Sequence, residues 1–368
     1  MNKSEQIAML SSFSNTPGAP GFEADVSKLA SSYLKDLGQL TQDKMHNLYL
    51  SREENSFQLD QTADRKQAGR LCVQLDAHQD EVAFMVSAIR ENGTLEFINL
   101  GGWVTSNIPA HLVKVMTRDG SYVTGLTTSK PPHFMTDAEK AAALKLEDVV
   151  IDVGSKSLED TLKLGIEVGL PVIPDVEARY MEDQDILLGK AFDCRAGCSA
   201  IVNVMRGLAG QKLDVDVVAA LSTQEEVGTR GAQVTANRVK PDLAIVFEGC
   251  PADDTFTPAY KAQTCLGKGP MLRHIDARMV THPGFQRYAL DLAAEHNIPC
   301  QRAVRSGGST NGAPIHLSNQ GVPTIVIGIP VRYIHTSYGM LSLGDFQASV
   351  DLATAILRSM NADVYDQL

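Results

Sequence analysis

The stretch Leu221-Ser-Thr-Gln-Glu-Glu-Val-Gly-Thr-Arg-Gly-Ala232 indicates the fold class of this chain. The apolar run before it, residues 215–221, predicts a buried strand, and the glycines at 228 and 231 predict a turn that opens a helix. Glu225 and Glu226 would then lie at the carboxyl end of a strand, where open α/β sheets place their functional sites. Neighbouring side chains in extended backbone point in different directions, so one carboxylate can bind a metal while the other acts as a base. Taken alone, the pair is more simply a solvated acidic turn, so the rest of the chain decides.

Size and charge limit the classes of protein to which the chain can belong. It has 368 residues, more than one hydrophobic core usually serves, so we expect two domains. The net charge of −11 argues against general nucleic-acid binding, which needs a basic face. No apolar run reaches the roughly 18 residues of a membrane span, and the N-terminal residues do not resemble a signal peptide. We therefore expect a cytoplasmic protein without nucleic-acid or membrane partners.

The six cysteines are scattered along the chain and mostly stand next to apolar residues. This usage fits buried thiols in a reducing cytoplasm rather than a disulfide framework. Cys194 and Cys198 have C-x3-C spacing, but no second pair exists, so we expect no structural zinc site there.

The hydrophobic pattern divides the chain into two kinds of region. Helical spacing recurs at residues 4–13, 23–37, 197–208, 283–296 and 343–360, and strand-like runs occur at 40–50, 70–75, 215–221, 243–247 and 324–328. Short strand-like runs separated by glycine turns fill residues 83–174, with one helical piece at 137–146. Disorder is expected only in the polar segment 52–69. The sequence thus predicts an α/β domain made of residues 1–82 and 175–368, with a β-rich domain of residues 83–174 inserted into it.

Five residues with metal-binding side chains follow apolar, strand-like runs. They are His78, Asp193, Glu226, Glu248 and His335. Each alone is most simply the polar end of a strand, but the strands of one α/β sheet bring their carboxyl ends to one edge. Two imidazoles and three carboxylates suit two divalent ions such as Zn, Co or Mn if one carboxylate bridges them. Hydrolytic sites with two ions polarise the substrate carbonyl and activate a water molecule.

Such a site also needs a base to take the proton of the water, and Glu225, beside Glu226, is the candidate. Asp80 stands two residues after His78. It is expected to accept the second ring N–H of that histidine, which fixes the tautomer and raises the basicity of the ring.

Signatures of other enzyme classes are missing. The chain has no Gly-x-Ser-x-Gly elbow with a plausible triad, no His-Glu-x-x-His and no Gly-x4-Gly-Lys-Ser/Thr. A glycosidase that pairs Glu225 with another acid would leave His78, Asp193 and His335 without a role.

Four motifs, in this order along the chain, resemble those of the M42 family of metallo-aminopeptidases. They are Asp76-Ala-His-Gln-Asp80, Gly189-Lys-Ala-Phe-Asp-Cys-Arg-Ala-Gly-Cys198, Ser222-Thr-Gln-Glu-Glu-Val-Gly228 and Arg332-Tyr-Ile-His335. Matches in the β-rich segment, among them Gly101-Gly-Trp103, Lys130-Pro-Pro-His133 and Ile151-Asp-Val-Gly154, extend the resemblance over nearly the whole chain.

The resemblance implies a three-layer α/β catalytic domain of the zinc-peptidase type with an inserted PDZ-like dimerisation domain. It implies short peptides as substrates and a homo-oligomer, in which dimers form a hollow tetrahedral dodecamer whose sites face inward. Carried onto this sequence, it assigns His78 and Asp193 to one ion and makes Asp193 the bridge to the second. Glu226, Glu248 and His335 complete the site, and Glu225 is the general base of an aminopeptidase.

Two positions depart from the family pattern. Glu248 is an aspartate in many relatives, so a carboxylate is kept and the metal preference is left open. A motif of the Gly-Gly-Thr-Asp type reads Gly307-Gly-Ser-Thr-Asn311 here, so an acidic residue is lost, and altered recognition of the substrate amine is expected. A related two-metal deacylase or carboxypeptidase remains an alternative. A non-catalytic assembly protein on the same scaffold is a second one, against which the intact Glu225 and five ligands argue.

Overall fold

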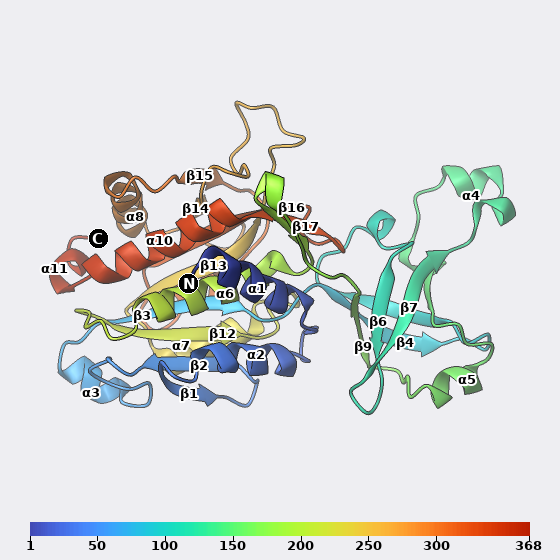
Figure 1. The fold of residues 1–368 in the computed structure, drawn as a ribbon, viewed down its shortest axis with the longest axis horizontal. Helices are drawn as coiled ribbons and strands as arrows, with labels where there is room; N and C mark the ends of the chain where they lie inside the picture. Colours follow the sequence, from blue (N-terminus) through green and yellow to red (C-terminus); the bar gives the residue numbers. More distant parts are fainter.

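The computed structural model describes all residues 1–368, which form two parts lying side by side (Figure 1). One part is a mixed α/β domain built on a large sheet, and the other is a small closed β-barrel. The first barrel strand, β4 (Ala83–Ile89), follows directly on β3 (Cys72–His78) of the large sheet. The barrel is therefore attached at the carboxyl end of β3, the edge at which the sequence predicts functional side chains.

The large sheet has eleven strands, and β12, β3, β13 and β16 are parallel neighbours at its centre. These four strands are buried almost throughout, as expected for strands that are covered on both faces. The remaining bounds in this sheet are β1 (Gly38–Gln42), β2 (Leu48–Arg52), β10 (Arg179–Met181), β11 (Ile186–Gly189), β12 (Asp216–Ser222), β13 (Leu243–Pro251), β14 (Met271–Ile275), β15 (Gln301–Val304), β16 (Thr324–Arg332) and β17 (Gly339–Ser342).

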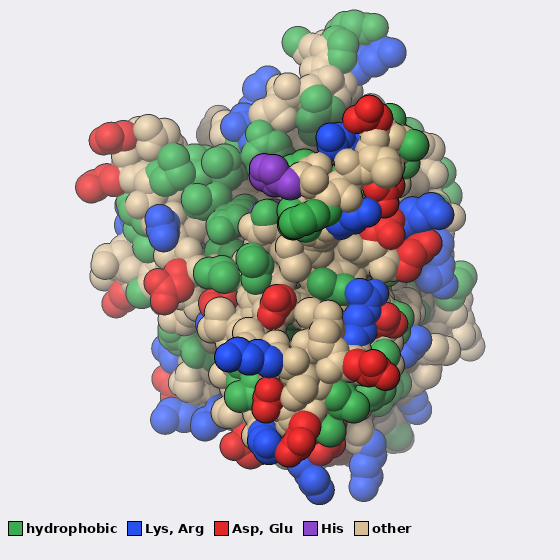
Figure 2. Space-filling model, turned by 90° about the vertical axis from the view of Figure 1, so that its right-hand side faces the viewer, with side chains coloured by type: hydrophobic (Ala, Val, Ile, Leu, Met, Phe, Trp, Pro, Cys, Tyr) green, Lys and Arg blue, Asp and Glu red, His purple; other side chains and the backbone are tan.

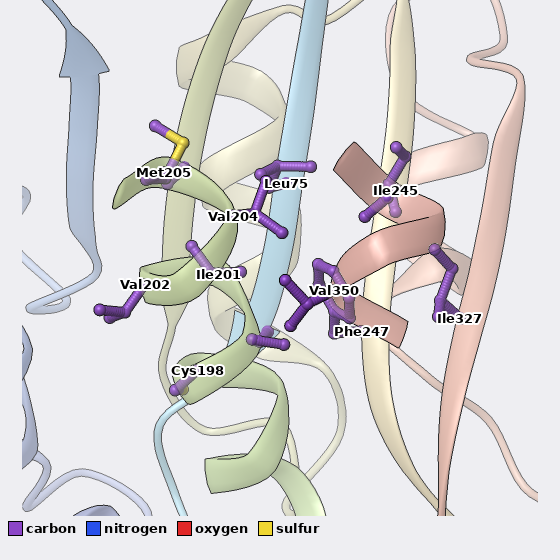
Figure 3. Close-up of a cluster of buried hydrophobic side chains, with 14 of the residues drawn as sticks. Leu75, Cys198, Ile201, Val202, Val204, Met205, Ile245, Phe247, Ile327 and Val350 are labelled. Atoms are coloured by element: carbon purple, nitrogen blue, oxygen red, sulfur yellow. The ribbon is translucent and has the colours of Figure 1, made fainter. Parts of the chain in front are cut away.

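The main hydrophobic core lies between one face of this sheet and its helices. Figure 3 shows Ile201 and Val204 of helix α6 (Phe192–Gly207) facing Leu75 of β3, with Phe247 of β13 beside Val350 of α10 (Leu343–Ser359). This core contains 48 buried residues, and burial of each large side chain contributes about 1.5–3 kcal/mol. The other helices that supply this core are α1 (Lys3–Asn15), α2 (Ala24–Leu34) and α8 (Pro283–Glu295).

The opposite face of the sheet is covered by α7 (Arg230–Val239) and α9 (Gly312–His316). Ala236 of α7 and Ile315 of α9 belong to one buried cluster with Val246 of β13. The α/β part therefore has three layers, with the sheet in the middle. Two short helices, α3 (Thr62–Gln67) and α11 (Ala362–Tyr365), complete it.

The barrel closes in the strand order β4, β5, β8, β7, β6, β9 and has its own core of eleven buried residues. In that core Phe84 packs against Phe97 with ring centroids 4.8 Å apart, and Trp103 stacks on the same Phe84 ring at 4.7 Å. Its elements are β5 (Leu95–Leu100), β6 (Leu112–Met116), β7 (Tyr122–Ser129), α4 (Asp137–Ala141), β8 (Val149–Asp152), α5 (Leu158–Lys163) and β9 (Pro171–Pro174).

The predicted elements compare well with the observed ones, with three exceptions. The helical piece expected at residues 137–146 is helical only over α4 (Asp137–Ala141), and residues 142–145 are not helical. The single strand expected at residues 40–50 is wrong, because a turn around His46 splits it into the antiparallel pair β1 and β2. The segment 52–69 is ordered rather than disordered, since it contains α3 and its Arg65 is buried, donating to the carbonyl oxygen of Lys240 at 2.9 Å.

All six cysteines are free thiols, and five of them are buried, as the sequence predicts. None of the helices has the length and apolar character needed to cross a bilayer.

Candidate active site

The predicted site residues meet at the carboxyl edge of the central strands. His78 is the last residue of β3 and pairs in register with Ser222, the last residue of β12. Glu225 and Glu226 follow that strand end within four residues. The parallel pairing of β3 and β12 therefore brings the histidine and the two glutamates to one place.

The remaining three residues reach this place from other elements. Glu248 lies within β13, which extends to Pro251, rather than after the strand end as expected. Asp193 is in the first turn of α6, where Asp193 and Cys194 have non-helical backbone angles. Gly249 permits this arrangement, because a Cβ at that position would lie 2.6 Å from the Asp193 Cα. His335 stands beyond β16 in a turn with a φ of +59°.

These side chains form two groups that share Asp193. In the first group, His78 Nε2 lies 3.3 Å from Asp193 Oδ1 and 3.5 Å from Glu248 Oε1. In the second, His335 Nε2 lies 3.4 Å from Asp193 Oδ2 and 3.7 Å from Glu226 Oε2. One oxygen of Asp193 thus faces each imidazole. A carboxylate placed in this way has the geometry to bridge two cations.

Asp80 connects the first group to the loop that carries the two glutamates. The Nδ1 atom of His78 lies 3.1 Å from the Asp80 carbonyl oxygen and 3.3 Å from its Oδ1. The two carboxylate oxygens of Asp80 accept hydrogen bonds from the backbone N–H groups of Glu225 and Glu226, at 2.9 and 3.0 Å. Asp80 is fully buried, so it fixes the loop directly beside His78.

Two more side chains hold the same loop. The Oδ1 atom of Asn47 accepts from the N–H of Thr223 at 2.8 Å, and Oε1 of Glu23 accepts from the N–H of Gln224 at 3.0 Å. With the two bonds to Asp80, the backbone N–H groups of residues 223–226 all donate to buried side-chain oxygens. This preorganises the backbone from which Glu225 and Glu226 project.

A buried ion pair supports the other side of the site. Both carboxylate oxygens of Glu81 contact the Lys190 ammonium, with Oε1 at 2.6 Å, and Arg195 lies 3.4 Å from Oε1. Arg195 also donates to the carbonyl oxygens of Phe13 and Thr16 at 2.9 and 2.8 Å. Asp193 lies in the chain between Lys190 and Arg195, so this network fixes the segment that carries the shared carboxylate.

The charge balance of the site fits bound cations. Burial and the nearby Asp193 raise the pKa values of Glu226 and Glu248 well above normal. Burial alone would lower the pKa of His78, but Asp193, Asp80 and Glu248 raise it well above its usual value. One buried oxygen each of Glu226 and Glu248 has no hydrogen-bond partner. Buried carboxylates with free lone pairs are costly unless they coordinate a cation, so the residues fit a metal centre.

Glu225 differs from the ligand candidates in its position. Its Oε2 lies 4.0 Å from His78 Nε2, at the margin of the first group. Burial raises its pKa to about 7, with a further rise from Asp80 and Asp193 against the lowering effect of His78. A carboxylate with a pKa near neutrality can both accept and return a proton.

Cys194 lies close to the first group but offers a thiol rather than a thiolate. Its Sγ donates to the carbonyl oxygen of Phe247 at 3.2 Å, and burial raises its pKa well above normal. Cys198 similarly donates to the carbonyl oxygen of His78 at 3.1 Å. Both thiols are buried and donate to backbone carbonyl oxygens beside the site.

Asn311, the amide that stands where the family motif has an acidic residue, does not face the ligand candidates. Asn311 is fully buried, and its Nδ2 donates to Asp76 Oδ1 and to Ser222 Oγ, each at 2.7 Å. The side chain lies at the start of α9 and is held against the sheet by these two acceptors on β3 and β12.

A small depression, open to solvent, adjoins the second group. Asp193, Glu226 and His335 line it on the polar side, and Phe192 and Ile334 line it on the apolar side. It gives a ligand access to the cluster.

Sequence patterns did not reveal Glu23, Asn47, Glu81 or Lys190 as supporting residues. A buried charge has no local signature, and each of these residues acts on a segment far away in the chain. The short spacing of Glu81 from His78 was the one available signal.

Comparison with known proteins adds the family context. The family model described as M42 glutamyl aminopeptidase matches residues 62–352. The glutamyl aminopeptidase of Lactococcus lactis subsp. cremoris is 32% identical over 292 residues, which cover 79% of this chain and 81% of that protein. The crystal structure of a TET aminopeptidase from a marine sediment archaeon, Thaumarchaeota archaeon SCGC AB-539-E09, superposes with a TM-score of 0.92 at 31% identity, covering 100% of this chain and 99% of that one. A TET1 peptidase of Pyrococcus horikoshii, which can assemble into a tetrahedron or a large octahedral shell, has a TM-score of 0.84 at 24% identity, covering 96% of this chain and 100% of that one.

Proposed function

The chain belongs to the M42 family of aminopeptidases and is a peptide hydrolase, and from this premise we propose that it removes N-terminal residues from short peptides at a centre of two divalent ions. The observation that carries the proposal is the position of Asp193. Its two oxygens face two different histidines, at 3.3 and 3.4 Å, and each histidine has a further carboxylate beside it.

His78, Asp193 and Glu248 would hold one ion, and Asp193, Glu226 and His335 the other. The five residues fall into these two groups by distance, with donor atoms within 4.8 Å of one another in each, and the Cys194 thiol lies within the same distance in the first. Imidazole and carboxylate donors suit Zn, Co or Mn. Such ions, when bound, supply Lewis acidity to a peptide carbonyl and to a water molecule.

Glu225 acts as the general base in this proposal. It takes a proton from the attacking water and gives it to the leaving amine, a role supported by its pKa near 7 and by its place at the margin of the first group. Asp80 is the positioning residue, because it fixes both His78 and the backbone of Glu225. A substrate with a free N-terminus is expected from the aminopeptidase family.

We further propose that residues 83–174 form a PDZ-like dimerisation domain and that residues 1–82 and 175–368 form the catalytic domain. Nine of the seventeen exposed large hydrophobic side chains lie in residues 83–174, a quarter of the chain. They are Ile98, Val104, Leu112, Leu126, Phe134, Leu158, Leu162, Leu164 and Val168. Figure 2 views the side of the molecule formed by the barrel, where hydrophobic side chains gather around a histidine. Such a surface favours contact with another copy.

We propose that such dimers assemble into a dodecamer, with the Pyrococcus horikoshii peptidase as a precedent for closed shells. A cytoplasmic location is supported by the six free thiols.

The test combines a substrate panel with one isosteric substitution. Aminoacyl-p-nitroanilides, and peptides with free, acetylated or amidated ends, are assayed after chelation and addition of Zn, Co or Mn. We expect turnover only with free N-termini and only with metal. Glu225→Gln is expected to lower kcat by about 10²–10⁴-fold and to keep both metal equivalents.

Glu295→Gln, on the exposed end of α8, serves as a control for the loss of one carboxylate. Full activity of Glu225→Gln contradicts the assigned base, and hydrolysis of acetylated peptides would instead support a deacylase. Absence of metal binding by the wild-type chain would overturn the metal centre as a whole.

A further inference from the structure

The barrel touches the candidate metal site through two glycines that follow β5. A Cβ at Gly101 would lie 2.9 Å from Glu226 Oε2 and 2.8 Å from Val82 Cγ1. A Cβ at Gly102 would lie 2.9 Å from His335 Nδ1 and 3.3 Å from its Cε1. Real Cβ atoms do not approach other heavy atoms so closely. The His335 ring could not keep its position beside a side chain at residue 102, and a side chain at residue 101 would displace the end of Glu226 or Val82.

The glycines are held firmly by the barrel on both sides. Before them, Leu100 pairs with Ala83 in the β4–β5 ladder. After them, Trp103 stacks on the buried Phe84 ring, with centroids 4.7 Å apart. The Gly101–Gly102 segment is thus a rigid extension of the barrel core that ends against Glu226 and His335.

The two groups of ligand candidates differ in their dependence on the barrel. His78, Asp193 and Glu248 come from β3, α6 and β13 of the α/β part, and His78 has Asp80 as a second support. His335 stands in a turn, its side chain is 37% exposed, and its Nδ1 faces Gly102 rather than a carboxylate. The barrel backbone thus takes the place of a supporting side chain.

We propose that Gly101 and Gly102 are positioning residues through which the barrel orients Glu226 and His335. This inference rests on the proposed metal centre and adds that different parts of the chain support its two groups of ligands. The α/β part alone builds the first group, whereas the second group is complete only when the barrel is seated against it.

The experiment measures metal binding rather than activity. After chelation, Zn²⁺ and Co²⁺ are titrated into the wild type, Gly102→Ala and Gly101→Ala by calorimetry, and the visible absorption of bound Co²⁺ is recorded. Gly120→Ala and Gly154→Ala are matched controls, because both lie in the barrel part with φ of +84° and +78° and open space around the Cβ. They reproduce the backbone strain expected at Gly101, which has a φ of +89°, without the contact to the site.

We expect the wild type and both controls to bind two equivalents per chain. Gly102→Ala, which has no unfavourable φ to adopt, is expected to keep one equivalent unchanged and to weaken the other by about 10–100-fold, the range typical of lost support around a metal ligand. Gly102→Ser and Gly102→Val should weaken it progressively further, and the Co²⁺ spectrum should lose the contribution of one site.

Wild-type affinity for both equivalents in Gly102→Ala would overturn the inference, and so would equal weakening of both equivalents in a variant that melts like the wild type. If the wild-type chain itself binds no metal, the proposed metal centre is contradicted, and the inference that rests on it falls with it. A Gly101→Ala variant that behaves like Gly120→Ala would remove Gly101 from the proposal and leave Gly102.

Discussion

Asn311 donates a 2.7 Å hydrogen bond to Asp76 in the fully buried layer beneath the candidate site. Asp76 also accepts from Gln74, Thr235 and Ser222, all uncharged donors. The family motif has an acidic residue at position 311. Here an amide stands at that position, at the start of α9, and donates to the carboxylate of Asp76 on β3. One buried carboxylate, and not two, occupies this layer.

Asn311→Asp should consequently destabilise the fold. It replaces the donor with a second carboxylate that faces Asp76, which leaves two buried acceptors without a proton between them. The expected loss in free energy of unfolding is about 1–3 kcal/mol or more, the cost of an unsatisfied buried group. Chemical denaturation at neutral pH measures it. Asn237→Asp, exposed on α7, carries the same charge change and should be nearly neutral. Equal stability of the two variants would contradict this explanation of Asn311.

Asp80→Asn tests the support of the catalytic loop. Only one of its two side-chain atoms could still accept a hydrogen bond, so either the Glu225 or the Glu226 N–H would lose its partner. We expect a fall of about 10–100-fold in kcat or in metal affinity, as for other residues that support metal ligands.

Steady-state kinetics and metal titration of Asp80→Asn separate these two effects. Glu23→Gln is the matched control, because both of its hydrogen bonds end on Oε1, which glutamine keeps. If Asp80→Asn retains wild-type kinetics and metal affinity, Asp80 has no positioning role.

The sequence was sufficient for the parts of the site that follow strand ends. His78 and Glu226 could be placed together because both come after apolar runs, and parallel strands end at one edge. Glu248 is predicted for the same reason, although β13 runs four residues further than its apolar pattern suggests. For these residues the hydrophobic pattern of the sequence and the topology of the sheet predict the same position.

The residues that were missed depend on contacts between distant segments. Glu23 reaches Gln224 across 201 positions, and Gly102 reaches His335 only after the barrel has folded and docked. A glycine doublet in a sequence predicts a turn, and nothing in its spacing reveals which side chain needs the empty space. Such contacts follow from tertiary packing, which hydrophobic periodicity does not describe.

The buried pair of Glu81 and Lys190 offers a third prediction, about stability. Lys190→Met should cost about 3–5 kcal/mol, because it removes the main partner of a buried carboxylate. Glu81→Gln combined with Lys190→Met should recover part of this loss, since glutamine keeps the acceptor for Gly18 and Arg195. Denaturant unfolding of the single and double variants gives the coupling energy.

Lys163→Met, which breaks the exposed pair with Glu159, is the control and should have little effect. If Lys190→Met proves as mild as Lys163→Met, the buried pair does not stabilise the fold.

Removal of metal should make the stability of the chain depend on pH in a defined direction. Burial and Asp193 raise the pKa values of Glu226 and Glu248 in the folded protein without metal. The folded state then holds more protons than the unfolded state above a pH of about 4.5. The stabilising contribution of these groups is present below that pH and is lost as the pH rises through the raised values.

The chelated protein should therefore melt at progressively lower temperature between pH 5 and pH 8. Added Zn²⁺ or Co²⁺ should raise the melting temperature most at pH 8, because the cation replaces the protons as the compensating charge. His78, whose pKa is also raised, contributes with the same sign, whereas the lowered pKa of Asp193 acts only below this range. Differential scanning fluorimetry across the pH range measures both curves, and Glu248→Gln should flatten the metal-free one. A metal-free melting temperature that stays constant or rises from pH 5 to pH 8 would show that the charges of these carboxylates do not destabilise the metal-free fold.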